Sequence, residues 1–382
     1  MERVSNVFEF VGYLEFGKDN VKSLSSEKSD WKKKTLNMAV TDRNGNRPYV
    51  NVVGSFNKSL KIFGVKNDKG ESVTLDIPYS EVNNKDVMDK IPDFKKFKVD
   101  VDDIKITTIS DWDFEAFVEA NQANLKGKLA KVTGIIETSE WNGKIYTNYT
   151  VQRIVGVTDE AVKSEGTIGV YFTEDSLVKD NLKTTGIVEV NGYVDSYNKL
   201  AKDKTVFLPI SLKFDFSKEL EALKAETTTK EDKDRIAKRM DYLVKSFETY
   251  NEDGEKARIT NGKVYYQDWK VRIISGTEEK EITMEDLTSD QRMVIELGIS
   301  TFDEIKAQMR GRIQGEKKRD TLLIVPNMKN KSGAEDTKMT VDDLSNRISE
   351  STTIPAVATE QQTKKVEVKV DSTDIDDMLA GI

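Results

Sequence analysis

Alternation of apolar and polar residues runs through much of the chain and predicts a mainly β protein with α-helical connectors. Between residues 125 and 217, "KGKLAKVTGIIETSEW" and "KIYTNYTVQRIVGV" alternate on either side of Asn142–Gly143, a strong hairpin signal. The runs "GTIGVYF", "GIVEVNGYV" and "TVFLPISLKF" follow, with a helical turn at "EDSLVKD" after the first of them. Five strands with a small helix between the third and the fourth predict a barrel over 125–217. A sandwich is the alternative, but Gly134 in a long first strand favours the bend that a barrel needs.

The rest of the chain divides into further regions by periodicity and composition. Strand-like runs fill 1–110, for which we expect a second barrel, and apolar spacing predicts a connecting helix at 111–124 and a helical linker at 218–247. Residues 248–330 combine strand-like and helical stretches, and 331–382 has no aromatic residue and is rich in Ser, Thr, Asp and Lys. We therefore predict two or three barrels of one type, joined by helices, ahead of a disordered acidic tail.

One phrase of the predicted hairpin recurs in the third region. "NGKIYTNYTVQRI" begins at 142 and "NGKVYYQDWKVRI" begins at 261. If the phrase marks a repeat, 248–330 is a diverged copy of 125–217. Chance similarity between two amphipathic hairpins is the alternative.

Alternation along each strand also separates a core face from an outer face. In 144–152 alternation assigns Tyr149 to the core and Tyr146 to the outer face, beside Lys144. An exposed ring beside a lysine suits a nucleotide whose base stacks on the ring and whose phosphate contacts the lysine. The same test on neighbouring strands and loops gives the full set of aromatic and basic candidates: Lys131, Trp141, Lys144, Tyr146, Tyr193, Tyr197, Lys199, Lys202, Lys204 and Phe207. Weaker candidates are Trp31, Lys32, Lys33 and Lys34 in the first region and Tyr266, Lys270 and Arg272 in the third. Ordinary surface aromatics, packing against a neighbouring domain and, at 31–34, a charged edge strand are the alternatives.

Composition excludes several classes of site. The chain has no Cys and no His, which excludes disulfides, thiolate or imidazole metal sites and His-dependent triads. There is no G-x-x-x-x-G-K loop and no Gly-rich dinucleotide fingerprint, so we expect no cofactor and no enzymatic activity, with carboxylate-bound Mg²⁺ as the alternative chemistry. The N-terminus lacks a signal-peptide pattern and no apolar run approaches the roughly 20 residues of a membrane span, so we expect a cytoplasmic protein.

Net charge is −8, and residues 331–382 hold 11 acidic against 6 basic residues. The chain ends in "DSTDIDDMLAGI", whose four apolar residues fall at the i, i+3, i+4, i+7 spacing of one helix face. Aspartates stand at the expected N-cap and in the first turn, where the helix dipole favours them. We expect this tip to fold when an apolar groove with a basic rim accepts it, and a solubilising acidic end is the alternative. The docking candidates are Asp374, Ile375, Asp376, Asp377, Met378, Leu379 and Ile382.

The organisation resembles the OB-fold family of single-stranded DNA-binding proteins, with "VTGIIETSEWNGKIYTNYTVQRI" (132–154) similar to the first hairpin of such barrels. The tip lacks the closing Pro-Phe of the familiar bacterial proteins, and several barrels share one chain, which is closer to a bacteriophage type. The resemblance implies a non-catalytic protein of DNA replication or recombination in a bacterial host's cytoplasm. It implies bases of single-stranded DNA (or RNA) stacked on the outer aromatics, and replication or recombination proteins recruited by the tip. A structural or virion protein whose barrels bind protein or glycan, and a Mg²⁺-dependent nuclease, are the alternatives.

Overall fold

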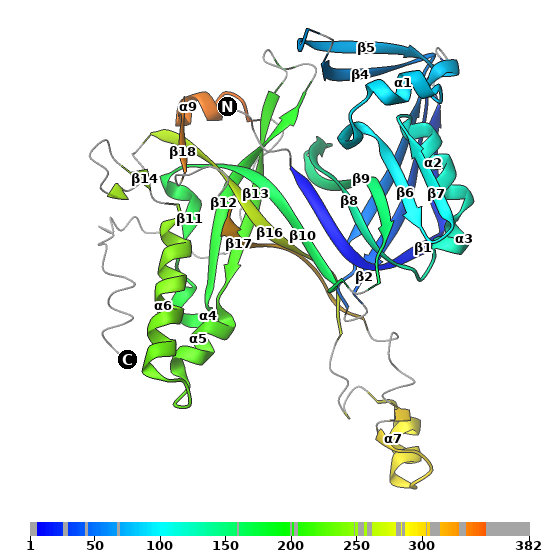
Figure 1. Ribbon diagram of the computed structural model, residues 1–382. Helices are drawn as coiled ribbons and strands as arrows, with labels where there is room; N and C mark the ends of the chain where they lie inside the picture. The colour runs from blue at the N-terminus through cyan, green and yellow to red at the C-terminus, as the bar shows by residue number, and fades with distance from the viewer. Residues whose placement is uncertain are drawn as a thin grey trace.

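The computed structural model describes residues 6–25, 30–42, 45–66, 69–158, 160–198, 201, 205–247, 249–250, 256–257, 262–279, 284, 287–302, 304–305, 314–327 and 334–348. The protein is mainly β, and its strands form two units that lie side by side in Figure 1. We call the unit that runs from β1 to β9 the first unit and the one that runs from β10 to β18 the second unit.

Five strands of the first unit close into a mixed barrel. Going round it, they are β1 (Val7–Ser25), β2 (Lys32–Thr41), β3 (Tyr49–Phe56), β9 (Lys144–Gly156) and β8 (Leu129–Trp141). The ring closes where β8 pairs with the start of β1, from Val7↔Ile135 to Tyr13↔Leu129. All joins are antiparallel except that of β3 with β9, which is parallel through Asn51↔Thr150.

Period-two alternation explains why these segments are strands with one buried face. Leu36, Met38 and Val40 of β2 face inward together with Val50 and Val52 of β3. Each such side chain stabilises the fold by about 1.5–3 kcal/mol when it leaves water. Gly134 of β8 lies under Phe8, and a Cβ there would come within 1.9 Å of the Thr150 carbonyl oxygen, so the tight crossing of these strands requires glycine.

The chain between β3 and β8 forms an insertion that ends in a helix against the barrel. It contains the hairpin β4 (Ser59–Lys66) and β5 (Ser72–Pro78), η1 (Tyr79–Glu81), α1 (Lys85–Lys90), η2 (Asp93–Lys95) and the hairpin β6 (Phe97–Val101) and β7 (Ile104–Thr108). α2 (Asp111–Ala120) and α3 (Gln122–Leu125) follow. The side chain of Ser110 caps α2 by accepting the Asp113 amide at 3.1 Å, and Phe114 and Val118 enter the core.

The second unit repeats the strand order of the first. Its strands follow each other round as β10 (Lys163–Phe172), β12 (Ile187–Tyr197), β13 (Thr205–Asp215), β17 (Gln314–Pro326) and β16 (Lys263–Glu279), which returns to β10. Two of these joins consist of single residue pairs, Tyr171↔Tyr193 and Lys213↔Leu322. β10 also pairs with β1, so the two units share one continuous sheet.

The remaining elements of the second unit sit in the connections between its strands. η3 (Glu174–Ser176), β11 (Leu177–Val178) and α4 (Leu182–Thr185) join β10 to β12. α5 (Ser217–Lys224) and α6 (Lys230–Lys245) cover one side of the unit, and the small hairpin β14 (Thr249–Tyr250) and β15 (Lys256–Ala257) follows. α7 (Ser289–Glu296) lies in the β16–β17 connection, and β18 (Glu335–Thr340) and α9 (Val341–Ser345) come last.

Several expectations from the sequence are wrong about which segments of the chain pair with one another. Residues 125–217 do not form a barrel of their own, because β8 and β9 complete the ring of β1, β2 and β3. The described residues contain one closed barrel rather than two or three. Within the tail expected to be disordered, 331–382, residues 334–348 instead form β18 and α9, which pack on the second unit, and the rest of the tail lies outside the described residues.

Candidate nucleic-acid interface

The outer end of the β8–β9 hairpin presents an aromatic and basic face. Cross-strand pairs Ser139↔Tyr146 and Trp141↔Lys144 place these four side chains on the same face of the hairpin. Trp141 is 68% exposed and Tyr146 is 41% exposed. Because Ser139, opposite Tyr146, is small, it leaves the tyrosine ring open on that side. We call Trp141, Lys144 and Tyr146 the hairpin patch.

The turn at the tip holds the patch in place. Asn142 (φ 51°) and Gly143 (φ 71°) both adopt left-handed backbone conformations, which the Asn-Gly sequence favours and which match the twist of the flanking strands. The patch therefore flanks a two-residue turn rather than a long loop.

Tyr149, three residue pairs further in, faces the barrel, as the alternation predicts. Its ring lies 5.6 Å from that of Phe8 and 5.4 Å from that of Phe10, centre to centre. Burial raises the pKa of its hydroxyl to about 12. The register expected for 144–151 is thus confirmed: Tyr146 is outside and Tyr149 packs inside.

A hydrogen bond joins β12 of the second unit to β8 of the first. Ser196 Oγ of β12 donates to the carbonyl oxygen of Thr138 on β8 at 2.7 Å. Tyr197 follows directly and is 73% exposed. Tyr197 therefore lies on a strand that contacts β8, the strand that carries Trp141.

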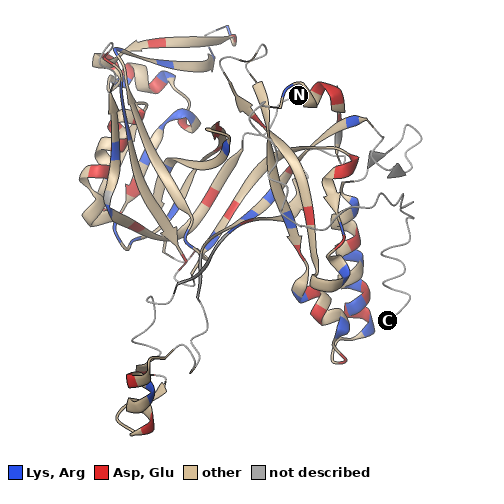
Figure 2. Cartoon of the chain, turned by 180° about the vertical axis from the view of Figure 1, so that it is seen from behind, with Lys and Arg blue, Asp and Glu red and all other residues tan. Residues whose placement is uncertain are grey.

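The predicted basic residues fall into two groups. Among the described residues no carboxylate lies within ion-pair distance of Lys144, which is exposed. By contrast, Lys131 forms an ion pair with Glu160 and Lys270 forms one with Glu165 at 2.9 Å. Arg272 is exposed on β16. Figure 2 shows acidic and basic residues interspersed over both units, so the patch is a local basic site on a mixed surface.

The stretch Trp31–Lys34 enters the middle of the barrel sheet rather than an edge. β2 pairs with β1 on one side and with β3 on the other, which rules out a charged edge strand. Trp31 and Lys32 are exposed and Lys33 is half-buried. Lys34 is not free for a phosphate: its Nζ donates to Glu119 of α2 at 2.8 Å, and this hydrogen bond raises the pKa of the lysine.

Three aromatic candidates share a face as predicted but are not outside. Phe207 is 2% exposed, Tyr266 is 7% exposed and Tyr193 is half-buried. They lie together on the second unit, and residues 334–348 cover them. The expectation of exposure is wrong because the covering segment was expected to be disordered.

Other candidates lie outside the described residues. These are the lysines of the β12–β13 connection, Lys199, Lys202 and Lys204, and the tip residues Asp374, Ile375, Asp376, Asp377, Met378, Leu379 and Ile382.

The structure also shows exposed aromatic residues that the sequence analysis missed. Tyr49, at the start of β3, has the Arg47 guanidinium 5.5 Å from its ring centre, and alternation in "YVNVV" would have placed it outward. Phe63 and Phe94 are both exposed, and Lys95 joins them: its Nζ donates to the Phe63 carbonyl at 2.6 Å and lies 5.4 Å from the Phe94 ring centre. No local signal links Phe63 to Phe94, because the contact depends on how the insertion folds.

Within the described part of the chain, no group of three or more acidic side chains is placed to hold a metal ion. None of the described helices has the length and apolar character to cross a membrane. No protein-family model and no curated protein matches this sequence.

Proposed function

We propose that this protein binds single-stranded nucleic acid, with DNA of replication or recombination as the expected ligand, and that it does so without catalysis. The observation that carries the proposal is the pair of exposed rings Trp141 and Tyr146 beside Lys144, with the exposed Tyr197 on β12, a strand that contacts β8. Solvent-exposed rings next to a free cation suit stacked bases and a phosphate, and such stacking tolerates any sequence because every base has a π face.

The connectivity of the barrel supports the same proposal. Its order β1-β2-β3-β9-β8, with α2 between the third and the fourth strand, is the one we expect of an OB fold. In that fold the ligand lies over strands 2 and 3, between the loop that joins strands 1 and 2 and the loop that joins strands 4 and 5. Trp31 and Lys32 occupy the end of the former loop, and Trp141–Lys144 forms the latter. Tyr49 lies on strand 3 itself.

Titration of fluorescent oligo-dT at two salt concentrations tests the proposal. Tyr146→Ala and Trp141→Ala should each weaken binding by about 1–3 kcal/mol, the usual contribution of one stacked base. Lys144→Gln should reduce the slope of log K against log salt by about 0.7. Tyr242→Ala is the matched control, because Tyr242 is a half-exposed tyrosine on α6 rather than on the hairpin. Absence of oligonucleotide binding, or equal affinity in all variants, would refute the proposal.

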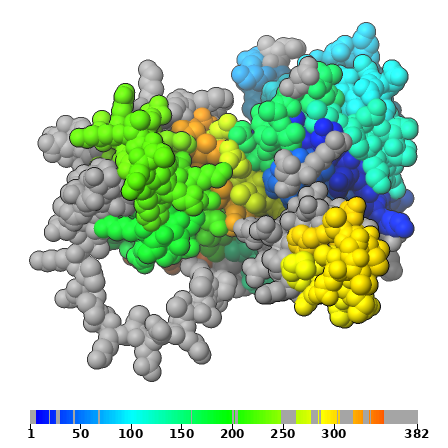
Figure 3. Space-filling view, turned by 90° about the horizontal axis from the view of Figure 1, so that it is seen from below, coloured from blue at the N-terminus to red at the C-terminus, as the bar shows by residue number. Residues whose placement is uncertain are grey.

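A role as a protein-interaction module is the second candidate, and one observation favours it. The segment 287–302 has a small core of its own around Leu287, and Met293, Leu297 and Ile299 are exposed on it. Figure 1 shows this segment below both units, and Figure 3 shows it from below as a rounded lobe (yellow). Exposed apolar side chains on a projecting helix suit a protein contact. This role would stand alone if the oligonucleotide titrations show no binding.

A further inference from the structure

One side of the second unit carries four aromatic rings, one from each of four strands. Tyr171 of β10 pairs across the sheet with Tyr193 of β12 and with Tyr266 of β16, and Phe207 of β13 pairs with Asp195, two residues from Tyr193. Because side chains alternate, this register places all four rings on one face. The ring of Tyr171 lies 4.9 Å from that of Phe207 and 4.8 Å from that of Tyr266, centre to centre. We call these four residues the aromatic face.

The floor of the aromatic face is shaped for flat rings. Tyr266 lies across Gly169 so closely that a Cβ at that position would come within 2.1 Å of the tyrosine Oη. The opposite face of the same strands is aliphatic, with Val188, Val190 and Leu208 in the main core. The aromatic face is therefore a distinct surface and not an extension of that core.

A short segment near the end of the described chain covers this face. Residues 334–348, which we call the strap, comprise β18 and α9. Leu344 of α9 is buried against the rings, and Met339 and Val341 pack beside it. Within the described residues, this cluster is made only of the aromatic face, Val264 and these three strap residues.

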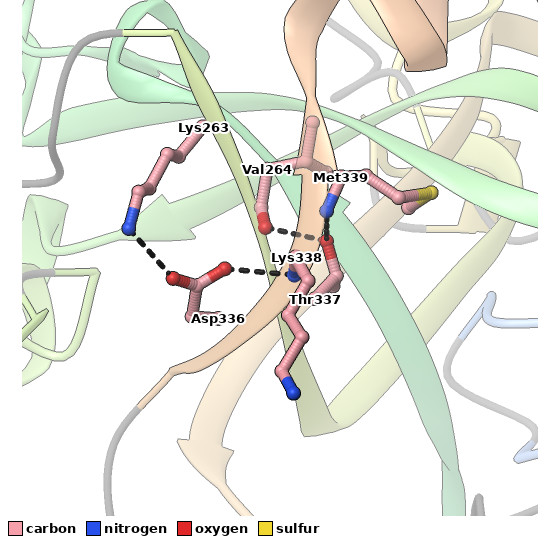
Figure 4. Close-up of polar contacts among 6 residues, drawn as sticks. All are labelled: Lys263, Val264, Asp336, Thr337, Lys338 and Met339. Atoms are coloured by element: carbon pink, nitrogen blue, oxygen red, sulfur yellow. Dashed lines mark hydrogen bonds and ion pairs between the residues drawn. The ribbon is translucent and has the colours of Figure 1, made fainter.

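The strap is held along β18, at Val341, whose amide donates to the Gly262 carbonyl at 3.0 Å, and at its C-terminal end. β18 pairs with the start of β16, where β17 does not reach, from Lys263↔Thr340 to Tyr266↔Glu335. Figure 4 shows the contacts there: Thr337 Oγ1 donates to the Val264 carbonyl at 2.6 Å, and Lys263 pairs with Asp336 at 2.9 Å. At the other end the Phe207 amide donates to the Arg347 carbonyl at 3.0 Å.

The strap is a short segment for the four rings that it covers. The ion pair of Lys263 with Asp336 is half-exposed, and such pairs stabilise little. Lys338 adopts a left-handed backbone conformation (φ 60°), which is unfavourable for a residue with a Cβ. The strap is also acidic, with Glu335, Asp336, Asp342 and Asp343 against Lys338 and Arg347. It thus carries the same sign of charge as a nucleic acid.

We propose that the aromatic face is a second site for single-stranded nucleic acid and that the strap is its removable cover. The inference rests on the function proposed above and adds a site and its regulation to it. When the strap leaves, Tyr193, Phe207 and Tyr266 become available for stacking. The apparent affinity of this site is the intrinsic affinity reduced by the fraction of molecules in which the strap is open.

A reversible cross-link tests the proposal, because the chain has no cysteine of its own. Directly paired antiparallel residues have Cα atoms about 4.5–5.5 Å apart, within the range that a disulfide spans. Lys263→Cys with Thr340→Cys therefore locks the strap when oxidised and frees it when reduced. Lys61→Cys with Asp76→Cys is the matched control, since these residues pair in the β4–β5 hairpin of the first unit.

The readout is the number of nucleotides bound per protein, titrated with long oligo-dT in both redox states. The reduced strap variant should occupy about 4 nucleotides or more beyond the oxidised one, the smallest contribution of one barrel-type site. The control pair should show the same site size in both states. Equal site sizes for the oxidised and reduced strap variant would overturn the second site while leaving the hairpin patch intact. Absence of binding in both states would instead refute the proposed function itself.

Hydrogen exchange on the unmodified protein gives an independent measurement. Saturating oligo-dT should speed exchange of the amides in 334–348 and of Phe207, whose amide is held by Arg347. Unchanged or slower exchange of the strap on binding would overturn the proposal. Tyr193→Ala, introduced into the reduced cross-link variant, should return the site size to that of the locked form.

Discussion

Glu115 makes the stability of the first unit dependent on pH. This residue of α2 is fully buried next to Gly54 of β3, and neither carboxylate oxygen has a hydrogen-bond partner among the described residues. Burial raises the pKa of its carboxyl to about 7, although the charge of Lys34 opposes the shift. The ordinary value is 4.5.

The sign and size of the effect follow from linkage. Below pH 4.5 the carboxyl is protonated in both states, and no stability is lost. Between pH 4.5 and about 7 the unfolded chain ionises while the folded protein stays protonated, so stability falls as the pH rises. At 1.36 kcal/mol per unit of pKa, the full loss above pH 7 is about 3 kcal/mol.

Glu115→Gln should remove this loss, because the amide keeps the shape of the protonated acid and cannot ionise. The variant should match the natural protein near pH 4.5 and exceed its stability by about 3 kcal/mol at pH 8. Urea unfolding at pH 5, 6, 7 and 8 measures the difference. Glu119→Gln is the control, since that partly exposed residue loses only its ion pair with Lys34 and should change stability by about 0–1 kcal/mol at every pH. A difference between Glu115→Gln and the natural protein that does not vary with pH would refute the reasoning.

Two further predictions concern the register of β9 and the acidic tip. Tyr149→Ala should lower the free energy of unfolding by about 3 kcal/mol or more through lost packing on Phe8 and Phe10, whereas Tyr146→Ala should leave the melting temperature unchanged. Deletion of 371–382, which lies outside the described residues, should tighten single-strand binding at low salt and abolish capture of a partner from host extract. Equal capture by the full-length and shortened proteins would leave the tip as a solubilising end only.

Local pattern predicted the strands and their faces well. Alternation in 144–151 separates Tyr146 from Tyr149 correctly, because one face of the strand has to be apolar to pack on Phe8 and Phe10. Asn142–Gly143 identified the hairpin turn for an equally local reason, since both positions need positive φ.

Pairing between distant strands was not predictable in this way. The barrel closes where Val7 pairs with Ile135. The alternation of apolar and polar residues could not predict this pairing, because it does not indicate which strands are neighbours. We grouped consecutive strands into 125–217, whereas the barrel omits the whole insertion between β3 and β8. The partner of Lys34 illustrates the same limit, because Glu119 reaches it only once α2 has docked on β2 and β3.

At the aromatic face, the sequence assigned the side chains to the correct face of their strands but mispredicted their exposure to solvent. Phe207 and Tyr266 do lie on the side opposite the main core, but the strap that covers them has a polar, aromatic-free sequence. Its three apolar contacts, Met339, Val341 and Leu344, are too few to predict a folded segment. They suffice in the structure because β16 offers a free edge and the sheet offers a ready apolar surface.

The repeat in this chain is one of topology and not of the sequence phrase that suggested it. The phrase at 142–154 spans β9, the last strand of the first ring, whereas the phrase at 261–273 spans β16, the fourth strand of the second ring. Equivalent phrases therefore occupy non-equivalent positions, and their likeness comes from an Asn-Gly pair ahead of an amphipathic strand. The strand order itself recurs, with helices between the third and fourth strands in both units, although no matching sequence marks it. A five-stranded ring requires only alternation, turns and a few close-approach glycines such as Gly134, so two units can share an order without sharing residues. If both units bind single-stranded nucleic acid, the same strand order carries an exposed binding surface in the first unit, the hairpin patch. In the second unit it carries a binding surface that the strap covers, the aromatic face.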